Sequence, residues 1–553
     1  MRQVSISDFE LAQVKNYVQN LTTHNPIPGG TVAIFDESGV VAEFAFGFAE
    51  LSSQTPMKIN HKFEIGSISK TLTSLLVLAL SDDGLIDIDK PVTDYVPWFD
   101  CGKPFAAITA RHLMSHTSGL IMGSDHIPDE LAQVWSLRDS VRSGALGERF
   151  HYSNLGYMAL GALVEQVTDS KMSDVLRKRV LLPMGITDAR VGLVHADRKD
   201  MATGHWPLYD DQTWLEGDPI AAATWFEIAC ADGNVAADIH ELSKLGQLLL
   251  SDGQLNGNQV ISSETFNQLV NPAAPTGEDI ANWGNHSNVT SSRYGLGVNV
   301  ESIHGNHCVT HGGGMVGYAT FLLADRTSAF GVSVLTNGNG EFPAAQQIAR
   351  VIHNCLLKGF EDIPSPDVNV HASELDSNSF GEFASILYDG EEMKIQVQSS
   401  SDDLVQIICN GEQGYLIRTW SKRFVASIPA LRRFHFQWDG ENWTYGPHLL
   451  SNEKQKVLPP TNEQFALVGH YRCYSPWFTN FRIVYRSGSL IMIAPGGVEA
   501  PNEDQQLVDI GAGVYRIGTD EWLPERLTSG PVINGKAITV TRDSLVYSRS
   551  FTD

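Results

Sequence analysis

The sequence has few cysteines and no pattern that would pair them or make them metal ligands. Its six cysteines are scattered along 553 residues without a Cys-x-x-Cys pair, so neither a zinc site nor a disulfide framework is expected. No apolar run is long enough to span a bilayer, and the first residues lack the apolar core of a signal peptide. These absences favour reduced thiols, no bound metal and a cytoplasmic location.

Positive charge is also scarce. The chain carries 39 Lys and Arg residues against 64 Asp and Glu residues, which gives a formal net charge of -25. Such a surface repels phosphate backbones and anionic lipids, so neither nucleic acid nor a membrane is expected as a partner. The length exceeds what one core supports and indicates about two to four domains.

What the sequence does contain is a serine at the expected start of a helix, with a lysine one turn later. Residues 63–70 read Phe-Glu-Ile-Gly-Ser-Ile-Ser-Lys, and the apolar run 75–80 follows. Residues three apart lie on the same face of a helix, so the Lys70 amine can reach the Ser67 hydroxyl. Burial by the apolar run would favour the neutral, basic form of that amine. The pair therefore predicts an activated nucleophile.

The same Ser-x-x-Lys pattern occurs a second time and is interpreted differently. Ser451 and Lys454 also stand three apart, but their polar surroundings run on to Pro459-Pro460 and contain no apolar helix. Nothing there would desolvate the lysine, so Ser451 is not expected to react.

A second group, Tyr152-Ser153-Asn154, stands at the start of an expected helix over residues 153–167. A phenol beside an ammonium can share its proton, so Tyr152 could act as general base toward Ser67 and then as acid toward the leaving group. The Asn154 amide can hydrogen-bond a substrate amide and Lys70 together. Both residues are therefore candidates for the same site as Ser67.

A third group, His311-Gly312-Gly313-Gly314, lies at an expected strand edge and is followed by the apolar stretch 316–324. Glycines at that place let a substrate backbone come close. The amide of Gly314 could then pair with the amide of Ser67 as oxyanion donors, the second of them at a helix N-terminus.

In this order the three groups resemble the Ser-x-x-Lys serine hydrolases, the superfamily of β-lactamases and penicillin-binding proteins. The sequence is similar to the class C β-lactamase and D-aminopeptidase branch, in which Tyr-x-Asn and His-x-Gly are the second and third motifs. Segments such as 108–120 and 294–297 also look like that branch, and the resemblance covers most of residues 25–340. It implies that Ser67 is the nucleophile and that Lys70 and Tyr152 move protons.

The resemblance assigns the remaining residues by the same motifs. It makes Asn154 a substrate ligand and places His311, Gly313 and Gly314 on the strand edge that carries the second oxyanion donor. His116 and Ser118, in a turn after a short expected helix, are interpreted as structural.

The third motif departs from the wider superfamily, in which Lys-Thr-Gly commonly places a cation on the substrate carboxylate. His311 takes that place here, and an unperturbed histidine is mostly neutral at pH 7. This departure favours substrates that lack a carboxylate next to the scissile bond, such as N-terminal D-residues with an amide or peptide leaving group, or esters.

His-Gly-Gly-Gly is also an oxyanion motif of lipase-type α/β-hydrolases, where it precedes a nucleophile in Gly-x-Ser-x-Gly. This chain has no Gly-x-Ser-x-Gly, and its triple glycine follows Ser67. The α/β-hydrolase fold is therefore rejected.

The order of expected elements predicts the architecture. A hairpin over residues 31–49 and strands near 305–336 fit an antiparallel sheet assembled from both ends of one domain, with helices around it. After residues 363–366 the sequence turns to short alternating segments with Asp-Gly and Asn-Gly turns, and a second break falls at 458–460. We expect an α+β catalytic domain with a helical subdomain (1–363), followed by two all-β domains, each a small barrel or sandwich (364–460 and 461–553).

The predicted function is hydrolysis through an acyl-enzyme, without metal or organic cofactor, on a small molecule or short peptide. N-terminal D-amino-acid peptides or amides are the first expectation, followed by small acyl esters and then by β-lactams or DD-carboxypeptidase substrates. A non-enzymatic alternative is a peptide or β-lactam binding protein that is acylated but does not turn over. A homo-oligomer is left open.

Overall fold

The chain forms two compact units, which are described here one at a time. The computed structural model describes residues 4–123, 129–278, 288–339, 343–361, 363, 369–419, 423–453, 455–498, 500–501 and 503–550. Unit 1 comprises Met1–Trp206 and Ile220–Pro366, and unit 2 comprises Pro207–Pro219 and Asp367–Asp553. Within the described ranges, no helix combines the length and the apolar character needed to cross a membrane.

Unit 1 is built around an eight-stranded sheet to which both ends of the unit contribute. The strand order is β11-β12-β13-β14-β15-β1-β2-β3, and the N-terminal β1 pairs antiparallel with β15, with Val32 opposite Val334. The strands are β1 (Gly29–Asp36), β2 (Gly39–Glu50), β3 (Thr55–Pro56), β11 (Val289–Tyr294), β12 (Asn299–Ile303), β13 (Asn306–Met315), β14 (Tyr318–Asp325) and β15 (Phe330–Thr336). The predicted assembly of one sheet from both ends is confirmed.

Helices cover both faces of the central strands, which explains why β1 and β15 are buried along their whole length. Helix α7 (Ile239–Leu250) packs on β1, β14 and β15, while α9 (Ala344–Lys358) also packs on β14 and β15 and is contacted by α1 (Asp8–Thr23). A strand covered on both faces reads as a continuous apolar run rather than an alternating one.

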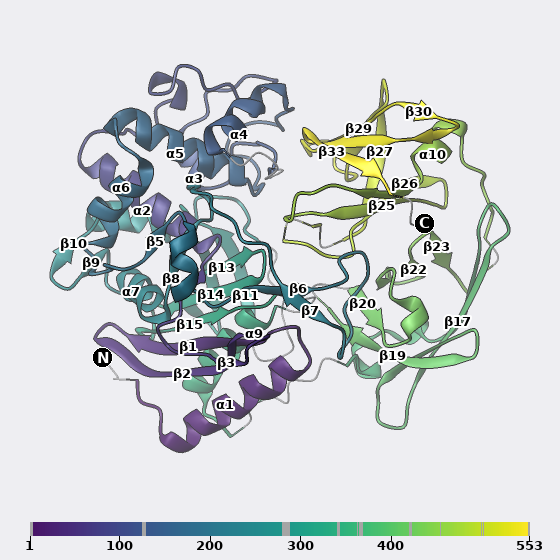
Figure 1. The fold of residues 1–553 in the computed structure, drawn as a ribbon, viewed down its shortest axis with the longest axis horizontal. Helices are drawn as coiled ribbons and strands as arrows, with labels where there is room; N and C mark the ends of the chain where they lie inside the picture. The colour runs from purple at the N-terminus through teal and green to yellow at the C-terminus, as the bar shows by residue number, and fades with distance from the viewer. Residues whose placement is uncertain are drawn as a thin grey trace. The chain divides into compact units, whose positions relative to one another are not determined.

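The remaining helices of unit 1 form the expected helical subdomain. They are α2 (Ile68–Asp82), α3 (Ala110–Met114), α4 (Glu130–Ser136), α5 (Asn154–Thr168), α6 (Met172–Leu176) and α8 (Ser263–Val270). Figure 1 shows α2 to α6 gathered at one end of unit 1, with α1 at the opposite end. Every residue of α2 from Ile68 to Leu80 is buried, so this helix forms the centre of the subdomain.

Short strands connect these two parts of unit 1. They are β4 (Phe63–Glu64), β5 (Arg190–Val191), β6 (His205–Pro207), β7 (Ile220–Ala222), β8 (Val235–Ala237), β9 (Gln254–Leu255) and β10 (Asn258–Gln259). Strand β4 pairs with β8, with Phe63 opposite Ala237, and so fixes the chain immediately before Ser67.

Unit 2 is all-β apart from short helical segments such as α10 (Asn462–Leu467), as the alternating segments predicted. Its first sheet contains β16 (Gly381–Ile386), β17 (Glu392–Ser399), β18 (Val405–Cys409), β19 (Glu412–Arg418), β20 (Arg423–Ala426), β21 (Phe436–Trp438), β22 (Trp443–Tyr445) and β23 (His448–Leu450). A closed barrel follows, made of β24 (Gly469–Arg472), β25 (Asn480–Arg486), β26 (Ser489–Ile493), β27 (Gln505–Gly511), β28 (Val514–Ile517), β29 (Arg526–Ser529), β32 (Thr539–Arg542) and β33 (Leu545–Arg549). The two-stranded sheet of β30 (Val532–Ile533) and β31 (Lys536–Ala537) lies between β29 and β32 in the sequence.

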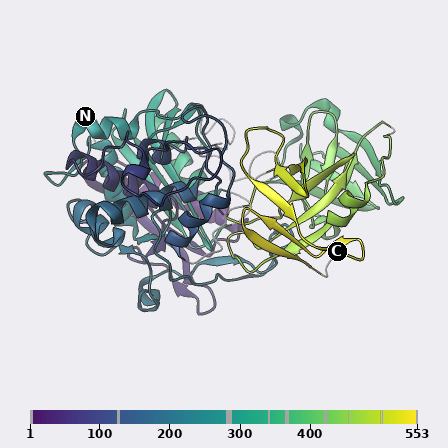
Figure 2. The ribbon, with the colours of Figure 1, turned by 90° about the horizontal axis from the view of Figure 1, so that it is seen from above.

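The first sheet and the barrel share apolar contacts. Val484 of β25 and Ile493 of β26 belong to the same buried cluster as Trp443 of β22, and Figure 2 shows the yellow barrel strands beside the green strands of the first sheet. The domain boundaries predicted at residues 363 and 460 stay a proposal, and residues 364–368 lie outside the described part of the chain.

A short segment between β6 and β7 belongs to unit 2 and is held there by arginines. The Arg472 guanidinium donates to both carboxylate oxygens of Asp210 at 2.8 Å, and Arg432 forms an ion pair with Asp218. The backbone of Thr213, whose side chain is fully buried, donates to the Arg432 carbonyl at 2.8 Å. Charge pairing therefore anchors Pro207–Pro219 in unit 2.

Removal of this charge pairing should destabilise unit 2. The double variant Asp210→Asn/Asp218→Asn is expected to lower its free energy of unfolding by about 1–2 kcal/mol, because both ion pairs are partly shielded from water. Thermal unfolding and limited proteolysis of the full chain would measure the loss. Asp402→Asn, at an exposed turn between β17 and β18, is the matched control; equal effects of the two changes would contradict the anchoring role.

Candidate active site

Ser67 stands at the N-terminus of α2 but does not cap the helix. It is the N-cap residue, with φ -62° and ψ -10°, and its side chain accepts no capping hydrogen bond. A serine in this position normally uses its oxygen to accept from the first turn. The Ser67 hydroxyl is thus available for other partners, and the residue is half-buried while its neighbours on both sides are buried.

Lys70 lies one turn later and points back to that hydroxyl. Its Nζ is 3.1 Å from Ser67 Oγ and donates to the Asp232 carbonyl oxygen at 2.8 Å. The Asp232 carboxylate is 3.8 Å away, and the Lys70 side chain is fully buried. The predicted approach of lysine to serine is therefore present, together with an acidic neighbour that the sequence did not indicate.

Tyr152 lies beside Lys70. The lysine Nζ is 5.1 Å from the centre of the Tyr152 ring, and the phenol forms a hydrogen bond with Ser67. Burial raises the pKa of Tyr152 well above its usual value, the Glu278 charge adds to this, and the bond with Ser67 opposes it. Tyr152 is consequently a neutral phenol in the resting site and can donate a proton.

His116 holds the Tyr152 ring in place. The two rings stack at 4.1 Å with an interplanar angle of 29°, and His116 Nδ1 accepts from the Ser153 backbone at 3.0 Å. Burial lowers the pKa of His116 well below its usual value, so the imidazole is neutral. The structure therefore gives His116, which the sequence suggested only as a structural residue, direct contact with a site residue.

The second motif forms the N-terminus of α5. Ser153 is its N-cap: the hydroxyl accepts from the Gly156 backbone at 3.1 Å and donates to the Ile121 carbonyl at 2.7 Å. Asn154 is the first residue of the helix, and its side chain is buried. A capped helix start thus fixes both Tyr152 and Asn154.

The third motif lies on β13, directly against the turn that carries Ser67. Gly66 has φ +55°, and a Cβ there would lie 2.7 Å from the Gly314 amide nitrogen. A Cβ on Gly313 would overlap the Ile65 carbonyl oxygen and the Thr320 hydroxyl. Glycines at 66 and 313 therefore permit the close approach that brings the Gly314 amide to the nucleophile turn.

His311 lies on the same strand, but its ring nitrogens are occupied by protein groups. Nδ1 is 2.6 Å from the Gly312 carbonyl and Nε2 is 2.8 Å from the Tyr294 hydroxyl. Burial, assisted by the Lys70 charge, lowers the pKa of His311 below its usual value, although Glu278 and the Gly312 carbonyl oppose the shift. The ring is thus neutral, with Nδ1 donating to the carbonyl and Nε2 accepting from the phenol.

Three residues near the site were not found from the sequence. Tyr294 belongs to the Tyr-Gly-Leu-Gly segment and could have been noticed there, whereas Asp232 and Glu278 stand in no motif. Glu278 Oε2 accepts from the Asn299 amide at 2.6 Å, and Asn299 is opposite Thr310, the residue before His311. Carboxylates far away in the sequence become site neighbours only through tertiary contacts.

Among the described residues, Ser451 has none of these surroundings. It forms an isolated bridge with Ala384, and its hydroxyl accepts from the Glu453 backbone at 3.1 Å. Lys454, the lysine of this second Ser-x-x-Lys, lies outside the described residues.

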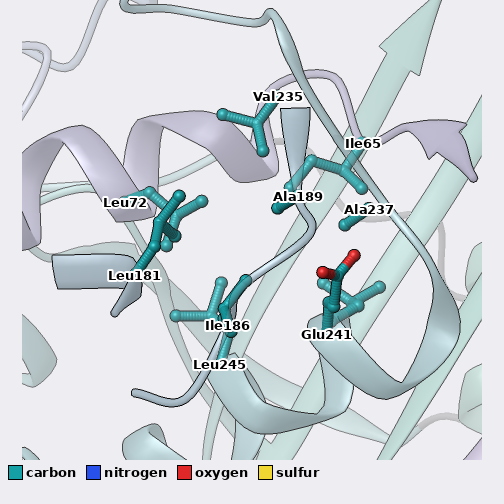
Figure 3. Close-up of a pocket in the computed structure, with 10 residues that line it drawn as sticks. Ile65, Leu72, Leu181, Ile186, Ala189, Val235, Ala237, Glu241 and Leu245 are labelled. Carbon is teal, nitrogen blue, oxygen red and sulfur yellow. The ribbon is translucent and has the colours of Figure 1, made fainter. Parts of the chain in front are cut away.

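A small cavity lies behind α2 and is distinct from the site. It has a volume of about 10 Å³ and is lined mainly by aliphatic side chains (Figure 3), including Ile65, Leu72, Leu181, Ile186 and Leu245. It holds one water molecule at most. We therefore regard it as imperfect packing around the nucleophile helix.

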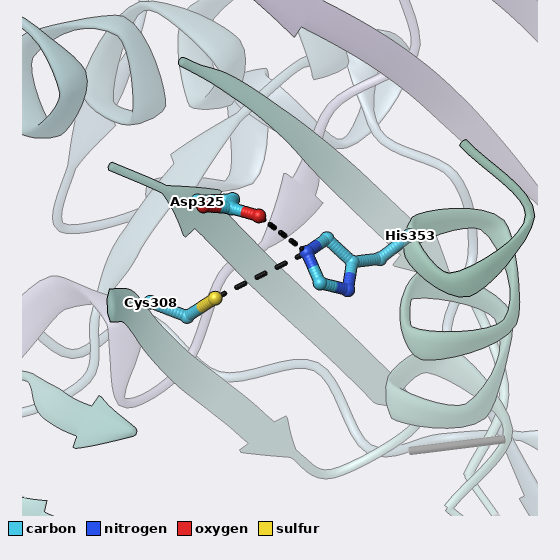
Figure 4. Close-up of side chains that lie close together, drawn as sticks. All are labelled: Cys308, Asp325 and His353. Atoms are coloured by element: carbon cyan, nitrogen blue, oxygen red, sulfur yellow. Dashed lines mark hydrogen bonds and ion pairs between the residues drawn. The ribbon is translucent and has the colours of Figure 1, made fainter. Parts of the chain in front are cut away.

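A cysteine, an aspartate and a histidine meet in the core beside β13. His353 Nε2 is 2.9 Å from Asp325 Oδ2 and 4.0 Å from Cys308 Sγ (Figure 4). Asp325 also accepts from the Asn306 amide at 2.7 Å and from the backbones of Thr327 and Ser328. These bonds use the acceptor positions of the carboxylate, and the group ties β13 and β14 to α9.

The antiparallel sheet, the helical subdomain and the three motifs of unit 1 are those of a β-lactamase-like protein. The chain belongs to the Beta-lactamase family, whose sequence model matches residues 14–355. This family includes serine hydrolases, and the resemblance drawn from the motifs is confirmed.

Individual relatives are distant. The chain is 24% identical to penicillin-binding protein 4* of Bacillus subtilis (strain 168) over 392 residues, which cover 67% of this chain and 82% of the relative. It is 24% identical to a D-aminopeptidase of Brucella anthropi over 330 residues, 57% of this chain and 56% of the relative. The chain thus spans about half the length of that D-aminopeptidase.

A solved structure shows the same fold. The octameric penicillin-binding protein homologue from Pyrococcus abyssi superposes with a TM-score of 0.56 at 19% identity, covering 80% of this chain and 99% of that chain. The α+β fold followed by all-β strands is confirmed. The catalytic roles of Ser67, Lys70 and Tyr152 stay predictions.

Proposed function

We propose that the chain is a serine hydrolase that forms an acyl-enzyme at Ser67. The observation that carries the proposal is the half-buried Ser67 hydroxyl, which is not used as a helix cap and accepts from Lys70 at 3.1 Å. A serine that only stabilised the helix would direct its oxygen to the first turn.

In the proposed acylation, the reactive form has Lys70 as a neutral amine: Ser67 Oγ attacks a carbonyl carbon and its proton passes to Lys70 Nζ, while Tyr152 remains a neutral phenol. The pair of Lys70 and Tyr152 then gives a proton to the leaving nitrogen or oxygen as its bond to the carbonyl carbon breaks. Deacylation reverses the order: a water loses a proton to the pair, attacks the ester, and Ser67 Oγ regains a proton. The raised pKa of Tyr152 supports its role as the proton donor of the pair.

The amides of Ser67 and Gly314 are the proposed oxyanion donors. Ser67 N lies at the N-terminus of α2, where the helix dipole favours negative charge. Gly314 N lies next to the Gly66 turn, as the lack of space for a Cβ at Gly66 indicates. Acyl transfer of this kind is completed by the protein's own groups, so we propose no metal or organic cofactor.

Small amides or peptides with an N-terminal D-residue are the proposed substrates. A neutral His311 with both ring nitrogens occupied offers no cation for a substrate carboxylate, and a D-aminopeptidase is among the relatives. Small acyl esters are the second candidate, while β-lactams and DD-carboxypeptidase substrates rank lower. Asn154 is the proposed ligand of the substrate amide. A homo-oligomer is included in the proposal because the Pyrococcus abyssi homologue is octameric.

Covalent labelling tests the proposal directly. A fluorophosphonate probe or fluorescent penicillin should modify Ser67 and leave Ser451 unmodified, because Ser67 lies beside the buried Lys70 at the start of an apolar helix. Peptide mapping by mass spectrometry locates the label, and Ser67→Ala should abolish it while Ser451→Ala should not. A label on another residue in place of Ser67 would rule out the assignment of Ser67 as the nucleophile.

Steady turnover separates the enzyme from a binding protein that is acylated only once. A burst of p-nitroaniline or p-nitrophenol followed by continued release shows an enzyme, whereas a stoichiometric burst alone shows the binding protein. A panel of D- and L-amino-acid p-nitroanilides and p-nitrophenyl esters identifies the acyl group.

A further inference from the structure

Glu278 lies beside the candidate active site and has no part in the proposed chemistry. The segment before it is held along β11: Ala274 N donates to the Tyr294 carbonyl at 2.9 Å, and Tyr294 N donates to the Thr276 carbonyl at 3.1 Å. A Cβ on Gly277 would lie only 2.9 Å from the backbone of β11. The backbone that leads to Glu278 is therefore fixed against the strand whose Tyr294 contacts His311.

The Glu278 side chain contacts β12, the strand that pairs with β13 and its third motif. Its Oε2 accepts from Asn299 Nδ2 at 2.6 Å, and Asn299 is buried on β12, opposite Thr310 of β13. Asn299 Oδ1 is buried and has no hydrogen-bond partner within the described residues. An acceptor oxygen without a donor thus lies next to a carboxylate.

The Glu278 carboxylate has no ion-pair partner in the part of the chain that the structure describes. None of the ion pairs formed among the described residues involves Glu278, and Lys70 is already engaged by Ser67 and Asp232. The Glu278 charge acts on the site. It adds to the effect of burial, which raises the pKa of Tyr152, and it opposes the lowering of the His311 pKa by burial. The two carboxylates, Asp232 and Glu278, leave the surroundings of Lys70 with an excess of negative charge.

We infer that Glu278, assisted by Asn299 Oδ1, binds a cationic group of the substrate, namely the free α-ammonium next to the scissile carbonyl. An α-amino group is mostly protonated at pH 7 and can donate to a carboxylate and an amide oxygen together. The same charge repels substrates that carry a carboxylate in this position. The inference rests on the proposed hydrolase and names the recognition group of that same site.

The test uses Glu278→Gln, which removes the charge but keeps an oxygen for the Asn299 amide. The substrates are D-alanine p-nitroanilide and N-acetyl-D-alanine p-nitroanilide, which differ only in the charge of the amine. The ratio of kcat/KM for the free amine to kcat/KM for the acetylated form should fall roughly tenfold to a hundredfold, mainly through KM, since a charge-assisted hydrogen bond is lost. Any effect of Glu278 on Tyr152 acts on both substrates and cancels in the ratio.

Glu264→Gln, an exposed carboxylate in the first turn of α8, is the control and should leave the ratio unchanged. An unchanged ratio in Glu278→Gln, or a wild type that prefers the acetylated substrate, would overturn the inference while leaving the hydrolase intact. Absence of both hydrolysis and Ser67 labelling would instead defeat the proposed function.

Binding gives a readout that does not need turnover. Calorimetry with D-alaninamide, a cationic amide, uses the Ser67→Ala background, which cannot form the acyl-enzyme. Addition of Glu278→Gln should weaken binding roughly tenfold or more, whereas addition of Glu264→Gln should leave binding unchanged. Equal affinity of Ser67→Ala for D-alaninamide and N-acetyl-D-alaninamide would overturn the inference even if the wild-type protein hydrolysed nothing.

Discussion

Lys70→Ala and Tyr152→Phe should each lower turnover by roughly 10² to 10⁴, and the double variant should be little worse than the poorer single variant. The reason is geometric: Lys70 Nζ contacts Ser67 Oγ and lies over the Tyr152 ring, and Tyr152 also bonds to Ser67. One proton leaves the serine, so loss of either partner interrupts the same transfer. Single-turnover rates on one ester or anilide measure all three variants.

Fully multiplicative losses would show that the two residues act independently. Lys90→Ala, an exposed lysine, is the control and should retain wild-type turnover. Because burial raises the pKa of Tyr152 well above its usual value, the phenol keeps its proton in the ordinary working range. Raising the pH to 9 should therefore not restore Lys70→Ala, and a rise in its rate over that range would contradict the assignment of Tyr152 as a proton donor.

The arrangement of Ser67 and Lys70 was predictable because its signals are local. A serine and lysine three apart, followed by an apolar run, place a hydroxyl and an amine on one helical face. The sheet was predictable for a similar reason, since apolar strands at both ends of unit 1 need partners. The sequence did not indicate that the Ser67 side chain would form no capping hydrogen bond, because capping depends on the φ and ψ angles of the residue.

Contacts between distant segments could not be read from the sequence. Asp232 and Glu278 stand in no motif and reach the site through contacts with Lys70 and Asn299. The His311 ring is occupied by Tyr294 and the Gly312 carbonyl. The assignment of Pro207–Pro219 to unit 2 depends on Arg432 and Arg472, more than 200 residues later in the chain. Composition and periodicity carry no information about such pairs.

The triple glycine shows how one motif combines positions with different demands. A Cβ on Gly312 would have the Phe321 ring as its nearest neighbour, at 3.7 Å, which is an ordinary contact. A Cβ on Gly313 would overlap the Ile65 carbonyl and the Thr320 hydroxyl, which itself donates to Ile65 at 2.9 Å. Neither glycine has a positive φ, so the two positions differ in the room available for a side chain and not in backbone conformation.

Gly313→Ala should therefore damage the site, while Gly312→Ala should be tolerated. The added methyl group must push β13 away from the Ile65-Gly66 turn, which displaces the Gly314 amide from the Ser67 amide. Loss of one oxyanion donor costs roughly 10² to 10³ in kcat, and overpacking costs about 1–3 kcal/mol of stability. Steady-state kinetics, the rate of fluorophosphonate labelling and chemical denaturation measure the three effects.

The comparison between the two alanine variants decides the role of the strand. If Gly313→Ala lost stability but kept its labelling rate, β13 would support the fold without supplying an oxyanion donor. If both variants lost activity equally, the motif would act through flexibility rather than through close approach. The expected pattern is a wild-type labelling rate for Gly312→Ala and a rate at least tenfold lower for Gly313→Ala, because only the second methyl group stands between the strand and the nucleophile turn.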